Sequence, residues 1–396
     1  MERIAGNRIS VKSGIMTCMQ GMSIFLKARN GIIGFLYKRV LKRALFRLDP
    51  ERVHDSAVMV GSFLGRRALF RVLTRVLFGY SHPSLAQTVA GIRFENPVGL
   101  AAGFDKNAQL TSILPAVGFG YEEIGSVTGE PCAGNRGRHL WRLPKSQGLV
   151  VYYGLKNDGC EAISQRMEKR DLRFPVGISI AKTNDAKTVE EAAGIRDYVK
   201  AYLAFRNKGI GDYFTVNISC PNAFGGEPFT DPDKLERLLS AIRREDPAPG
   251  KPIFLKLPAE LPSATIDRIV EVSRRHAVTG FVCTNLAKDR SNPAIKEADV
   301  PDVGGISGKV VQGLSDDLIS YLFRKHGREF VLVGCGGIFT AEDAYAKIKK
   351  GAMLLQLITG MIYEGPQAIS SINAGLVELL KKDGYAYLSQ AIGTEA

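Results

Sequence analysis

Residues 213–222 read YFTVNISCPN, and this stretch decides how the rest of the chain is interpreted. Its first half is a short apolar run, of the kind that forms a strand buried on both faces. Its second half ends that run abruptly and presents Asn217, Cys220 and Asn222. In α/β folds, functional side chains gather at the carboxyl ends of the strands. The stretch therefore predicts a buried parallel strand whose end carries a thiol between two amides.

The same pattern recurs along the chain, with seven more apolar runs between residues 97 and 359. These runs are PVGLAAG (97–103), YEEIGSV (121–127), PVGISIA (175–181), PIFLKL (252–257), GFVCTN (280–285), FVLVGCGG (330–337) and MLLQLIT (353–359). Segments with helical spacing separate them, among them 231–245, 263–276, 315–327 and 341–351. Eight strands alternating with helices predict an α/β fold, the (β/α)8 TIM barrel. A doubly wound open sheet is the alternative, but its first turn should read GxGxxG, and here that turn reads AAGFDKN.

The residues before the barrel follow a different pattern. Residues 31–80 predict two basic amphipathic helices, around YKRVLKRALFRL (37–48) and DSAVMVGSFLGRRALFRVLTRVL (55–77), with a turn or helix start at Asp49-Pro50. Such a pattern suits an anionic membrane surface, although a solvated helical face gives it too. The barrel would then occupy residues 81–396. Residues 1–30 remain poorly determined and read as a targeting segment or as an additional surface helix.

The composition narrows the class of protein. The chain has 396 residues, of which 45% are hydrophobic and 23% charged, so we expect a folded protein with a large core. Its net charge of +13 would suit nucleic acid, anionic lipid or anionic small molecules, but no nucleic-acid-binding motif is present. The six cysteines form no CxxC pair, so neither a metal site nor a disulfide framework is expected. No apolar run reaches about 18 residues, so we expect no membrane-spanning helix.

Polar side chains and glycines follow the predicted strands. They are Gly103, Lys106, Ser126, Asn217, Cys220, Asn222, Lys256, Thr284, Asn285, Gly337, Thr359 and Gly360. The amides and hydroxyls suit a small planar ligand with alternating donors and acceptors. Cys220 is a candidate general base or nucleophile, although most lone cysteines are inert core residues.

Two features of this set favour a cofactor. The glycine-rich loops of Gly337 and Gly360 follow the seventh and eighth strands, a recurrent phosphate position in barrels. Gly308, in GGISGK, could add to them, although each glycine alone is better explained by a tight turn. Lys256 lies near the end of an apolar strand, where its charge needs a partner. It would stabilise a reduced flavin, form a Schiff base or make a structural ion pair.

These residues resemble those of the dihydroorotate dehydrogenases, and mainly of class 2, the membrane-associated quinone-linked branch. The resemblance covers about residues 45–393 and rests on LFRLDPERVHD (45–55), ENPVGLAAGFDKN (95–107), GFGYEEIGSVT (118–128), GNRGRHLWRLP (134–144), VNISCPN (216–222), GGISGK (304–309), GCGGI (334–338) and AIG (391–393). It implies a TIM barrel that binds FMN and oxidises dihydroorotate to orotate in pyrimidine (UMP) biosynthesis. It also implies that the electrons pass to a quinone through the helical extension.

The resemblance assigns roles to individual positions. FMN would be lined by Ala101, Ala102, Gly103, Lys106, Ser126, Asn217, Lys256, Thr284, Gly308, Gly337, Thr359 and Gly360. The substrate would be bound by Lys106, Asn217, Asn222 and Asn285. Cys220 falls at the position of the base, which removes a proton from C5 of the substrate while a hydride leaves C6 for flavin N5. His54 and Arg136 would lie along the quinone tunnel.

Four positions depart from the class 2 pattern. Cys220 stands where class 2 enzymes usually have serine and class 1 enzymes have cysteine, and a thiol, with a usual pKa of about 8.5, loses its proton more easily than a hydroxyl. Val151 and Ser179 replace asparagines, and Ile358 replaces a tyrosine usual beside the flavin. A second hypothesis is therefore an FMN-dependent oxidoreductase of the same fold that acts on a different dihydropyrimidine or enone-type substrate. A third is a catalytically silent flavin-binding or membrane-scaffold protein.

The resemblance also implies a location. The protein would bind peripherally, through residues 31–80, to a mitochondrial inner membrane or to a bacterial cytoplasmic membrane. A single acidic residue in the first 48 would suit mitochondrial import. The sequence leaves the quinone and the oligomeric state open.

Overall fold

The computed structural model describes residues 25–396 apart from 171, 221, 223 and 249, and its centre is a closed parallel barrel. The barrel strands are β3 (Val98–Leu100), β4 (Tyr121–Val127), β7 (Val176–Ile180), β8 (Tyr213–Asn217), β9 (Ile253–Leu257), β10 (Gly280–Cys283), β12 (Val331–Cys335) and β13 (Leu354–Leu357). Each pairs with its neighbours in the order β10-β12-β13-β3-β4-β7-β8-β9, and the ring is closed. These are the eight predicted runs, so the TIM barrel is confirmed and the open sheet is excluded.

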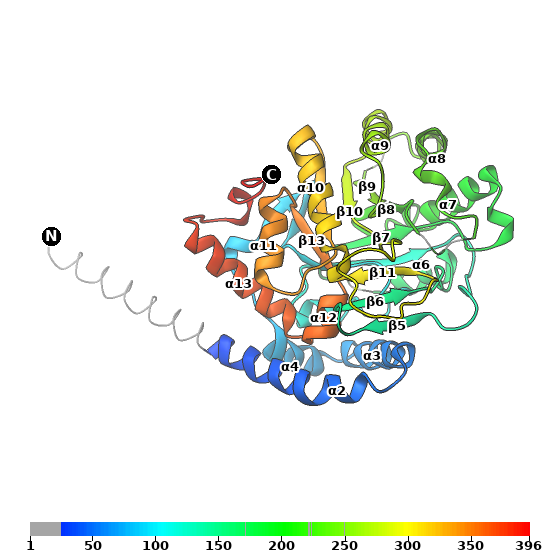
Figure 1. The fold of residues 1–396 in the computed structure, drawn as a ribbon. Coiled ribbons are helices and arrows are strands. Elements are labelled where there is room, and N and C mark those ends of the chain that lie inside the picture. The colour runs from blue at the N-terminus through cyan, green and yellow to red at the C-terminus, as the bar shows by residue number, and fades with distance from the viewer. Residues whose placement is uncertain (1–24, 171, 221, 223, 249) are drawn as a thin grey trace, which may run out of the picture.

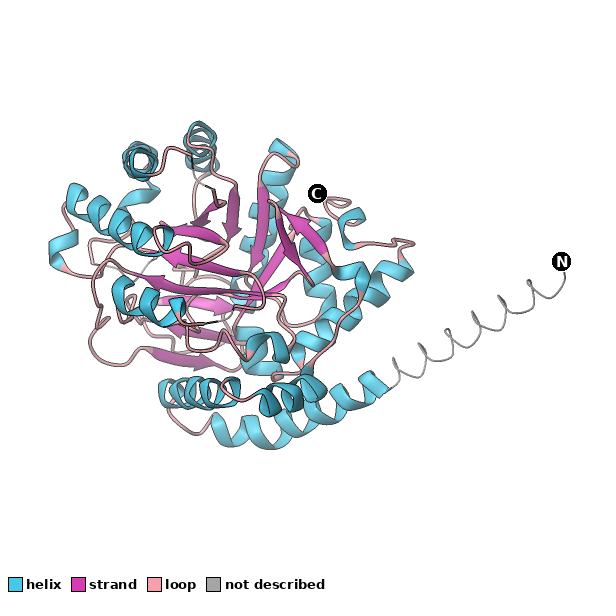
Figure 2. Cartoon of the chain, turned by 180° about the vertical axis from the view of Figure 1, so that it is seen from behind, coloured by secondary structure: helices cyan, strands magenta, loops and turns pink. Residues whose placement is uncertain are grey.

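Helices cover the outside of the barrel (Figures 1 and 2). They are α5 (Leu114–Val117), α6 (Cys160–Glu168), α7 (Glu191–Arg206), α8 (Pro232–Glu245), α9 (Ser263–Arg275), α10 (Gln312–His326), α11 (Ala341–Lys349), α12 (Thr359–Glu364) and α13 (Ala368–Lys382). Helix α8 illustrates why they form. The side chain of Asp231 accepts hydrogen bonds from the N–H groups of Asp233 and Lys234 and caps the first turn. Leu235, Leu238, Leu239 and Ile242, spaced three and four apart, are buried against the barrel.

The amino end of the barrel is filled with apolar side chains. Its interior cluster contains Tyr121, Tyr213, Phe254, Val282, Val333 and Leu354, together with Val89 and Phe94 from a hairpin. That hairpin, β1 (Gln87–Val89) with β2 (Ile92–Phe94), turns at Ala90 and Gly91, both of which have positive φ, as a two-residue hairpin turn requires. Because the amino end is packed, polar side chains inside the barrel lie toward its carboxyl end.

A second sheet lies between the barrel and the helical extension (Figure 1). It is antiparallel, in the order β11 (Gly305–Gly308), β6 (Gly148–Val151), β5 (Leu140–Leu143). The segment GGISGK was expected as a phosphate-binding loop, but most of it is strand β11, whose Ile306 pairs with Val150. Strand β5 contacts helix α3 (Pro50–Gly65) of the extension, so this sheet connects the extension to the barrel.

The extension contains more helical structure than the two helices expected. Residues 25–45 are helical throughout, including the π-helical turn η1 (Tyr37–Leu41) and α2 (Lys42–Leu45), so the helix continues through the expected boundary at residue 30. The expected start at Asp49-Pro50 is present, because the Asp49 side chain caps α3 (Pro50–Gly65). The single helix expected over 55–77 is wrong: α3 ends at Gly65 and α4 (Ala68–Phe78) begins after a break.

Close packing accounts for the break between α3 and α4. A Cβ on Gly65 would lie 3.3 Å from the Cβ of Ser112, and one on Gly61 would lie 2.6 Å from the Leu110 side chain. The end of helix α3 therefore packs closely against the barrel. The chain turns there, with Arg67 in an extended conformation. Residues 1–24, the rest of the poorly determined N-terminal segment, lie outside the described residues.

The extension exposes a large apolar surface. Its exposed apolar side chains are Phe25, Ile32, Phe35, Leu36, Val40, Leu41, Leu48, Met59, Val60, Phe63, Leu69, Val72, Leu73, Val76 and Leu77. A soluble monomer rarely exposes so many together, and such surfaces mark contacts with partners or membranes. Within residues 25–396, apart from the four gaps, no helix has the length and hydropathy needed to cross a membrane.

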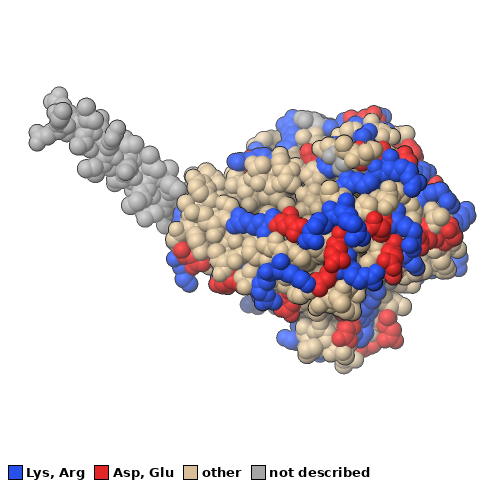
Figure 3. Space-filling view, turned by 90° about the horizontal axis from the view of Figure 1, so that it is seen from above, with Lys and Arg blue, Asp and Glu red and all other residues tan. Residues whose placement is uncertain are grey.

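On the face shown in Figure 3, Lys and Arg alternate with Asp and Glu rather than forming a patch of one sign.

Candidate active site

The predicted amide and hydroxyl residues form one hydrogen-bonded cluster at the carboxyl end of the barrel. The Asn217 side chain donates from Nδ2 to Ser126 Oγ over 2.9 Å, and Ser126 Oγ lies 2.7 Å from Ser179 Oγ. Asn285 Nδ2 lies 3.4 Å from Asn217 Oδ1 and 2.9 Å from Ser219 Oγ. We call Ser126, Ser179, Asn217, Ser219 and Asn285 the amide cluster. The sequence predicted three of its members as site residues and flagged Ser179 as a substitution.

Other predicted residues surround this cluster. Gly103 N–H donates to Gly125 O over 2.7 Å, which joins the loop after β3 to the end of β4. Thr284 is buried, and its N–H donates to Cys335 O over 2.8 Å. Ala102 lies on the loop after β3, next to Gly103. The barrel therefore brings the flavin-side positions of β3, β4 and β10 to one end.

Lys256 is a buried lysine at the end of strand β9. It is 4% exposed, pairs in register with Asn217 of β8, and points into the barrel two residues after the interior Phe254. Within the described part of the chain, its ammonium group makes no hydrogen bond or ion pair. A buried charge is costly unless a partner compensates it. The position therefore fits a bound group that presents an anionic or acceptor atom, such as a flavin ring.

A polar layer lies inside the barrel beneath this position. Glu123 Oε2 accepts from Thr215 Oγ1 at 2.8 Å and from Gln356 Nε2 at 2.9 Å. Glu123 Oε1 and Gln356 Oε1 are buried without a described partner. The interior thus changes from apolar at the amino end to polar under the candidate site, as a polar ligand requires.

The candidate phosphate loops converge. Ser307 Oγ, next to Gly308, lies 2.8 Å from Thr359 Oγ1. A Cβ on Gly337 would collide with Gln312, and one on Gly360 would collide with Ile338 O, so only glycine fits this crowded backbone. The N–H of Gly337 has no acceptor among the described residues. Helix α11 offers fewer free N–H groups to a phosphate than a helix start usually does, because Thr340 and Asp343 already cap its first turn.

Cys220 follows the amide cluster and is half-buried. Burial raises the pKa of its thiol to about 11, while the N–H of Asn222 and the cation of Lys182 act in the opposite direction. Lys182 is 3% exposed and donates to Phe224 O over 2.7 Å. The sequence argument expected easy deprotonation at this position, but in the ligand-free protein burial outweighs the intrinsic acidity of the thiol.

Asn222 is held by its own contacts rather than by the amide cluster. Its Nδ2 donates to Val151 O over 2.8 Å, at the end of β6. Its carbonyl accepts from Asn135 Nδ2 at 3.1 Å. Val151, one of the four departures, therefore lies beside a predicted substrate-binding amide.

Lys106 and His54 share a cavity of about 480 Å³ between α3 and the loop after β3. Lys106 Nζ lies 3.8 Å from the centre of the Tyr153 ring, and burial lowers its pKa to about 8. His54 Nε2 lies 2.8 Å from Phe104 O, and burial lowers the pKa of this imidazole too. A histidine of the extension therefore contacts the barrel loop that holds four predicted flavin positions, Ala101, Ala102, Gly103 and Lys106.

The second predicted tunnel residue is placed elsewhere. Arg136 is exposed and makes no described hydrogen bond or ion pair. Arg142, later in the same segment, instead donates to Leu48 O over 2.7 Å and lies 4.6 Å from the centre of the Phe46 ring. Of the two arginines, Arg142 has the described hydrogen bonds to the extension, and the tunnel role of Arg136 stays a prediction.

Sequence reasoning missed several residues that join these parts, namely Glu51, Asn135, His139, Arg142 and Lys182. Lys182 carried a usable signal, because it follows the strand VGISIA directly, as the other strand-end residues do. The remaining four lie in the extension or in the long segment between β4 and β6, where no strand periodicity marks them. Within the described residues, no group of His, Cys, Asp or Glu could hold a metal ion.

A closed parallel barrel with polar side chains at its carboxyl end is the architecture of the (β/α)8-barrel enzymes. A family model described as dihydroorotate dehydrogenase matches residues 84–380. The chain therefore belongs to the dihydroorotate dehydrogenase family.

Individual relatives agree over nearly the whole chain. The chain is 37% identical over 365 residues to a Natronomonas pharaonis protein named dihydroorotate dehydrogenase (quinone), covering 90% of this chain and 99% of that one. It is also 37% identical over 357 residues to a Myxococcus xanthus protein of the same name, with coverage of 89% and 96%. A ligand-free DHODH structure from Eimeria tenella aligns with a TM-score of 0.76 at 25% identity, covering 88% of this chain and 99% of that chain.

Proposed function

We propose that this protein oxidises dihydroorotate to orotate in pyrimidine biosynthesis, with FMN bound at the carboxyl end of the barrel and a quinone as electron acceptor. The observation that carries the proposal is the unpartnered Lys256 beside the amide cluster. A buried cation next to several amides suits a flavin and a pyrimidine ring that stack on one another. The family and the names of its relatives support the same activity.

The chain offers a complete set of contacts for FMN. Bound FMN supplies the hydride acceptor of the reaction. The ammonium of Lys256 stabilises negative charge on the ring, and the backbone around Gly308, Gly337, Thr359 and Gly360 holds the phosphate. Ser126 and Asn217 offer a hydroxyl and an amide to the polar edge of the ring.

The substrate is held by charge and by amides. Lys106 offers a cation to an anionic group, and Asn217, Asn222 and Asn285 offer donors and acceptors to the ring of dihydroorotate. Cys220 takes the proton that leaves C5 of the substrate. Because burial favours its neutral form, the thiol acts only after losing its own proton, and the nearby ammonium of Lys182 stabilises the thiolate.

The electron acceptor approaches from the side of the extension. His54 contacts the carbonyl of Phe104, directly after the flavin-side Gly103. Helices α3 and α4 expose the apolar side chains that a membrane surface requires, next to the arginines of these helices and of the break between them, Arg52, Arg66, Arg67, Arg71 and Arg75. The protein would therefore bind peripherally to an anionic membrane and take its quinone from the bilayer.

The test follows orotate formation by the full chain on anionic vesicles that contain a quinone. The proposal expects turnover of dihydroorotate with stoichiometric reduction of the quinone. A flavin-containing protein that forms no orotate with either a quinone or an artificial dye would contradict it.

A second candidate is the same flavin chemistry on a different dihydropyrimidine or enone-type compound. It is favoured by Ser179, which takes part in the amide cluster, and by Val151, whose backbone holds Asn222. Ile358 is the third departure near the site, with its Cδ1 4.0 Å from a Cβ placed on Gly103. A panel of such compounds decides between the two, because turnover of one of them without turnover of dihydroorotate would replace the first function by the second.

A further inference from the structure

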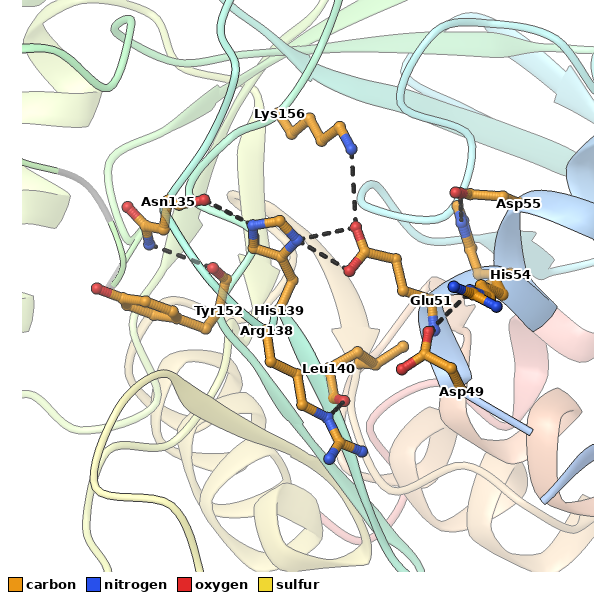
Figure 4. A network of polar contacts seen from close by, with 11 residues as sticks. Asp49, Glu51, His54, Asp55, Asn135, Arg138, His139, Leu140, Tyr152 and Lys156 are labelled. Atoms are coloured by element: carbon orange, nitrogen blue, oxygen red, sulfur yellow. Dashed lines mark hydrogen bonds and ion pairs between the residues drawn. The ribbon is translucent and has the colours of Figure 1, made fainter. Parts of the chain in front are cut away.

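A chain of polar contacts leads from Glu51 of helix α3 through His139 to Asn135 (Figure 4). Glu51, in the first turn of α3, lies 2.8 Å and 3.0 Å from His139 Nδ1 through its two carboxylate oxygens. His139 Nε2 lies 2.6 Å from the carbonyl oxygen of Asn135. The side chains of His139 and Glu51 are only 11% and 22% exposed, so water competes little for these contacts.

Both ring nitrogens of His139 face hydrogen-bond acceptors. One ring nitrogen faces a carboxylate and the other faces a backbone carbonyl, and both of these groups are acceptors. A neutral imidazole has a single N–H and could donate to only one of them. Both contacts are made when the imidazole carries a proton on each nitrogen and Glu51 is ionised. The link is then a charge-assisted ion pair, and Lys156 adds a second cation 3.7 Å from Glu51.

Asn135 connects His139 to the predicted substrate-binding residue Asn222. Its N–H donates to Tyr153 O over 3.1 Å, and its Nδ2 donates to Tyr152 O over 3.2 Å and to Asn222 O over 3.1 Å. Its Oδ1 accepts from Asn184 Nδ2 at 2.9 Å. Every polar group of Asn135 is therefore used, and a shift of its backbone would disturb Asn222.

The Asn184 side chain extends the chain of contacts to the segment after Cys220. Its Oδ1 accepts from the N–H of Phe224, and its Nδ2 also donates to Gly154 O over 3.1 Å. Asn135 therefore acts on the backbone after β8 at two points, Asn222 and Phe224.

The ring of His139 has a second effect. It stacks on Tyr153, with ring centres 5.3 Å apart and planes inclined by 19°. Lys106 Nζ lies 3.8 Å from the centre of the same Tyr153 ring. His139 therefore supports both Asn222, through Asn135, and Lys106, through Tyr153.

We propose that Glu51 and His139 are positioning residues that fix the substrate-binding Asn222 and Lys106 to the helical extension. The extension would then have a second role besides binding the quinone, because the first turn of α3 also fixes the positions of the substrate-binding residues. The substrate named here rests on the proposed function, whereas the coupling between the elements rests on the contacts alone.

Two variants test the coupling. Glu51→Gln keeps the shape of the side chain but removes its charge, so the charge-assisted contact with His139 is replaced by a weaker hydrogen bond between a neutral amide and the imidazole. His139→Phe keeps a ring to stack on Tyr153 and removes both polar contacts. The matched control is Glu364→Gln, which breaks the 3.0 Å ion pair to Lys38. That pair also joins the extension to the barrel, but it has no contact with Asn135.

The first readout is dye-linked oxidation of dihydroorotate by the FMN-loaded full chain. We expect Glu51→Gln and His139→Phe to lower kcat/KM about tenfold, the factor that 1.4 kcal/mol corresponds to, mainly through KM. The FMN content and the unfolding temperature should match those of Glu364→Gln, and kcat/KM of that control should stay within about twofold of the wild type. A purely structural ion pair would instead lower the unfolding temperature and leave KM unchanged.

The second readout does not need the substrate. Amide hydrogen exchange in peptides that contain Asn135, Tyr152 and Phe224 should become at least fivefold faster in Glu51→Gln than in Glu364→Gln. Exchange and KM unchanged from the control would overturn the proposal. If the wild type fails to oxidise dihydroorotate, the proposed function fails, yet the exchange rates still decide whether α3 is coupled to the site.

Discussion

The surroundings of Cys220 oppose the thiolate that its proposed role needs. Burial raises the thiol pKa to about 11, and Lys182 is the cation that acts against this effect. Lys182 is itself buried, and its ammonium is held by Phe224 O in the segment that follows Cys220. The cation of Lys182 therefore favours the Cys220 thiolate, whereas burial favours the neutral thiol and dominates the pKa.

Replacing Lys182 by Met should shift the pH dependence of flavin reduction. Without the cation the pKa of Cys220 rises further, and a rise of one pKa unit lowers the thiolate fraction about tenfold at any pH well below it. The rate of flavin reduction by dihydroorotate should then be about tenfold lower at pH 8. In both proteins the rate should keep rising with pH as long as the pH is below the pKa of the Cys220 thiol, which is about 11 in the wild type. Stopped-flow absorbance from pH 6.5 to 9.5 measures this, and Lys182→Arg, which keeps the charge, serves as the control; identical profiles for Met and wild type would contradict the role.

Replacing Lys256 by Met should separate stability from cofactor binding. The apoprotein should unfold at the same or a higher temperature, because a buried cation without a partner is removed. FMN should bind at least tenfold more weakly, as titration by flavin fluorescence would show. Lys347→Met is the matched control, because Lys347 is equally buried but is bonded to Asp316 at 2.6 Å. That change should cost about 3 kcal/mol of stability and leave FMN affinity unchanged; the same pattern in both variants would count against the Lys256 assignment.

At the residue scale, the sequence predicted side chains that follow strands and missed those that do not. Asn217, Lys256 and Asn285 could be placed because strand periodicity fixes which end of the barrel they occupy. Glu51 and His139 contact each other across 88 positions, and no local pattern marks such a pair. The sequence could not predict the raised pKa of Cys220 either, because this pKa depends on burial in the folded protein.

The elements were predictable where hydrophobic periodicity was strong. All eight barrel strands lie within the predicted runs, since strands covered on both faces are nearly continuous in apolar residues. The sheet of β5, β6 and β11 was missed, because β5 contains Arg142 and β11 contains two glycines, so neither forms a continuous apolar run. The break between α3 and α4 was missed because it comes from packing of Gly61 and Gly65 against the barrel, not from a capping signal.

Charges on the exposed face of α4 should separate membrane binding from chemistry. Val72 and Val76 are 59% and 61% exposed and lie one turn apart on the same side of the helix. The double change of both valines to Glu should abolish sedimentation with anionic vesicles and reduce quinone-linked turnover at least tenfold. Dye-linked turnover should remain within twofold of the wild type, because no contact to the barrel site is altered. Val303→Glu, at an exposed valine of the barrel, is the control, and equal losses with both acceptors would refute the membrane role of α4.

At the scale of the whole molecule, long-range polar contacts hold the extension in place. Arg29 donates to Val76 O over 2.8 Å, to Gly79 O over 3.1 Å and to Ser370 Oγ over 2.7 Å, so one side chain joins the first helix, α4 and α13. Lys38 pairs with Glu364 at 3.0 Å further along the same helix. Two basic residues of the extension, Arg29 and Lys38, therefore serve the fold, which charge patterning alone did not reveal.

Removing the Arg29 side chain should loosen this assembly. Arg29→Met should lower the free energy of unfolding by about 1–3 kcal/mol, because the part-buried Gly79 carbonyl and the buried Ser370 hydroxyl lose this donor. Urea denaturation followed by circular dichroism measures the change. Arg274→Met breaks an exposed pair with Glu329 and should change stability by less than about 1 kcal/mol. An equal effect of the two variants would show that Arg29 is no more important than a surface ion pair.

The most direct measurement is anaerobic mixing of the FMN-loaded protein with dihydroorotate in a stopped-flow spectrophotometer, with wild type and Cys220→Ala compared side by side. The assignment of substrate and base predicts complete loss of the oxidised flavin absorbance in the wild type. In Cys220→Ala the loss should be at least a hundredfold slower, as expected for a missing general base. An unchanged wild-type spectrum would show that dihydroorotate is not the substrate, and equally fast bleaching in the variant would show that Cys220 is not the base.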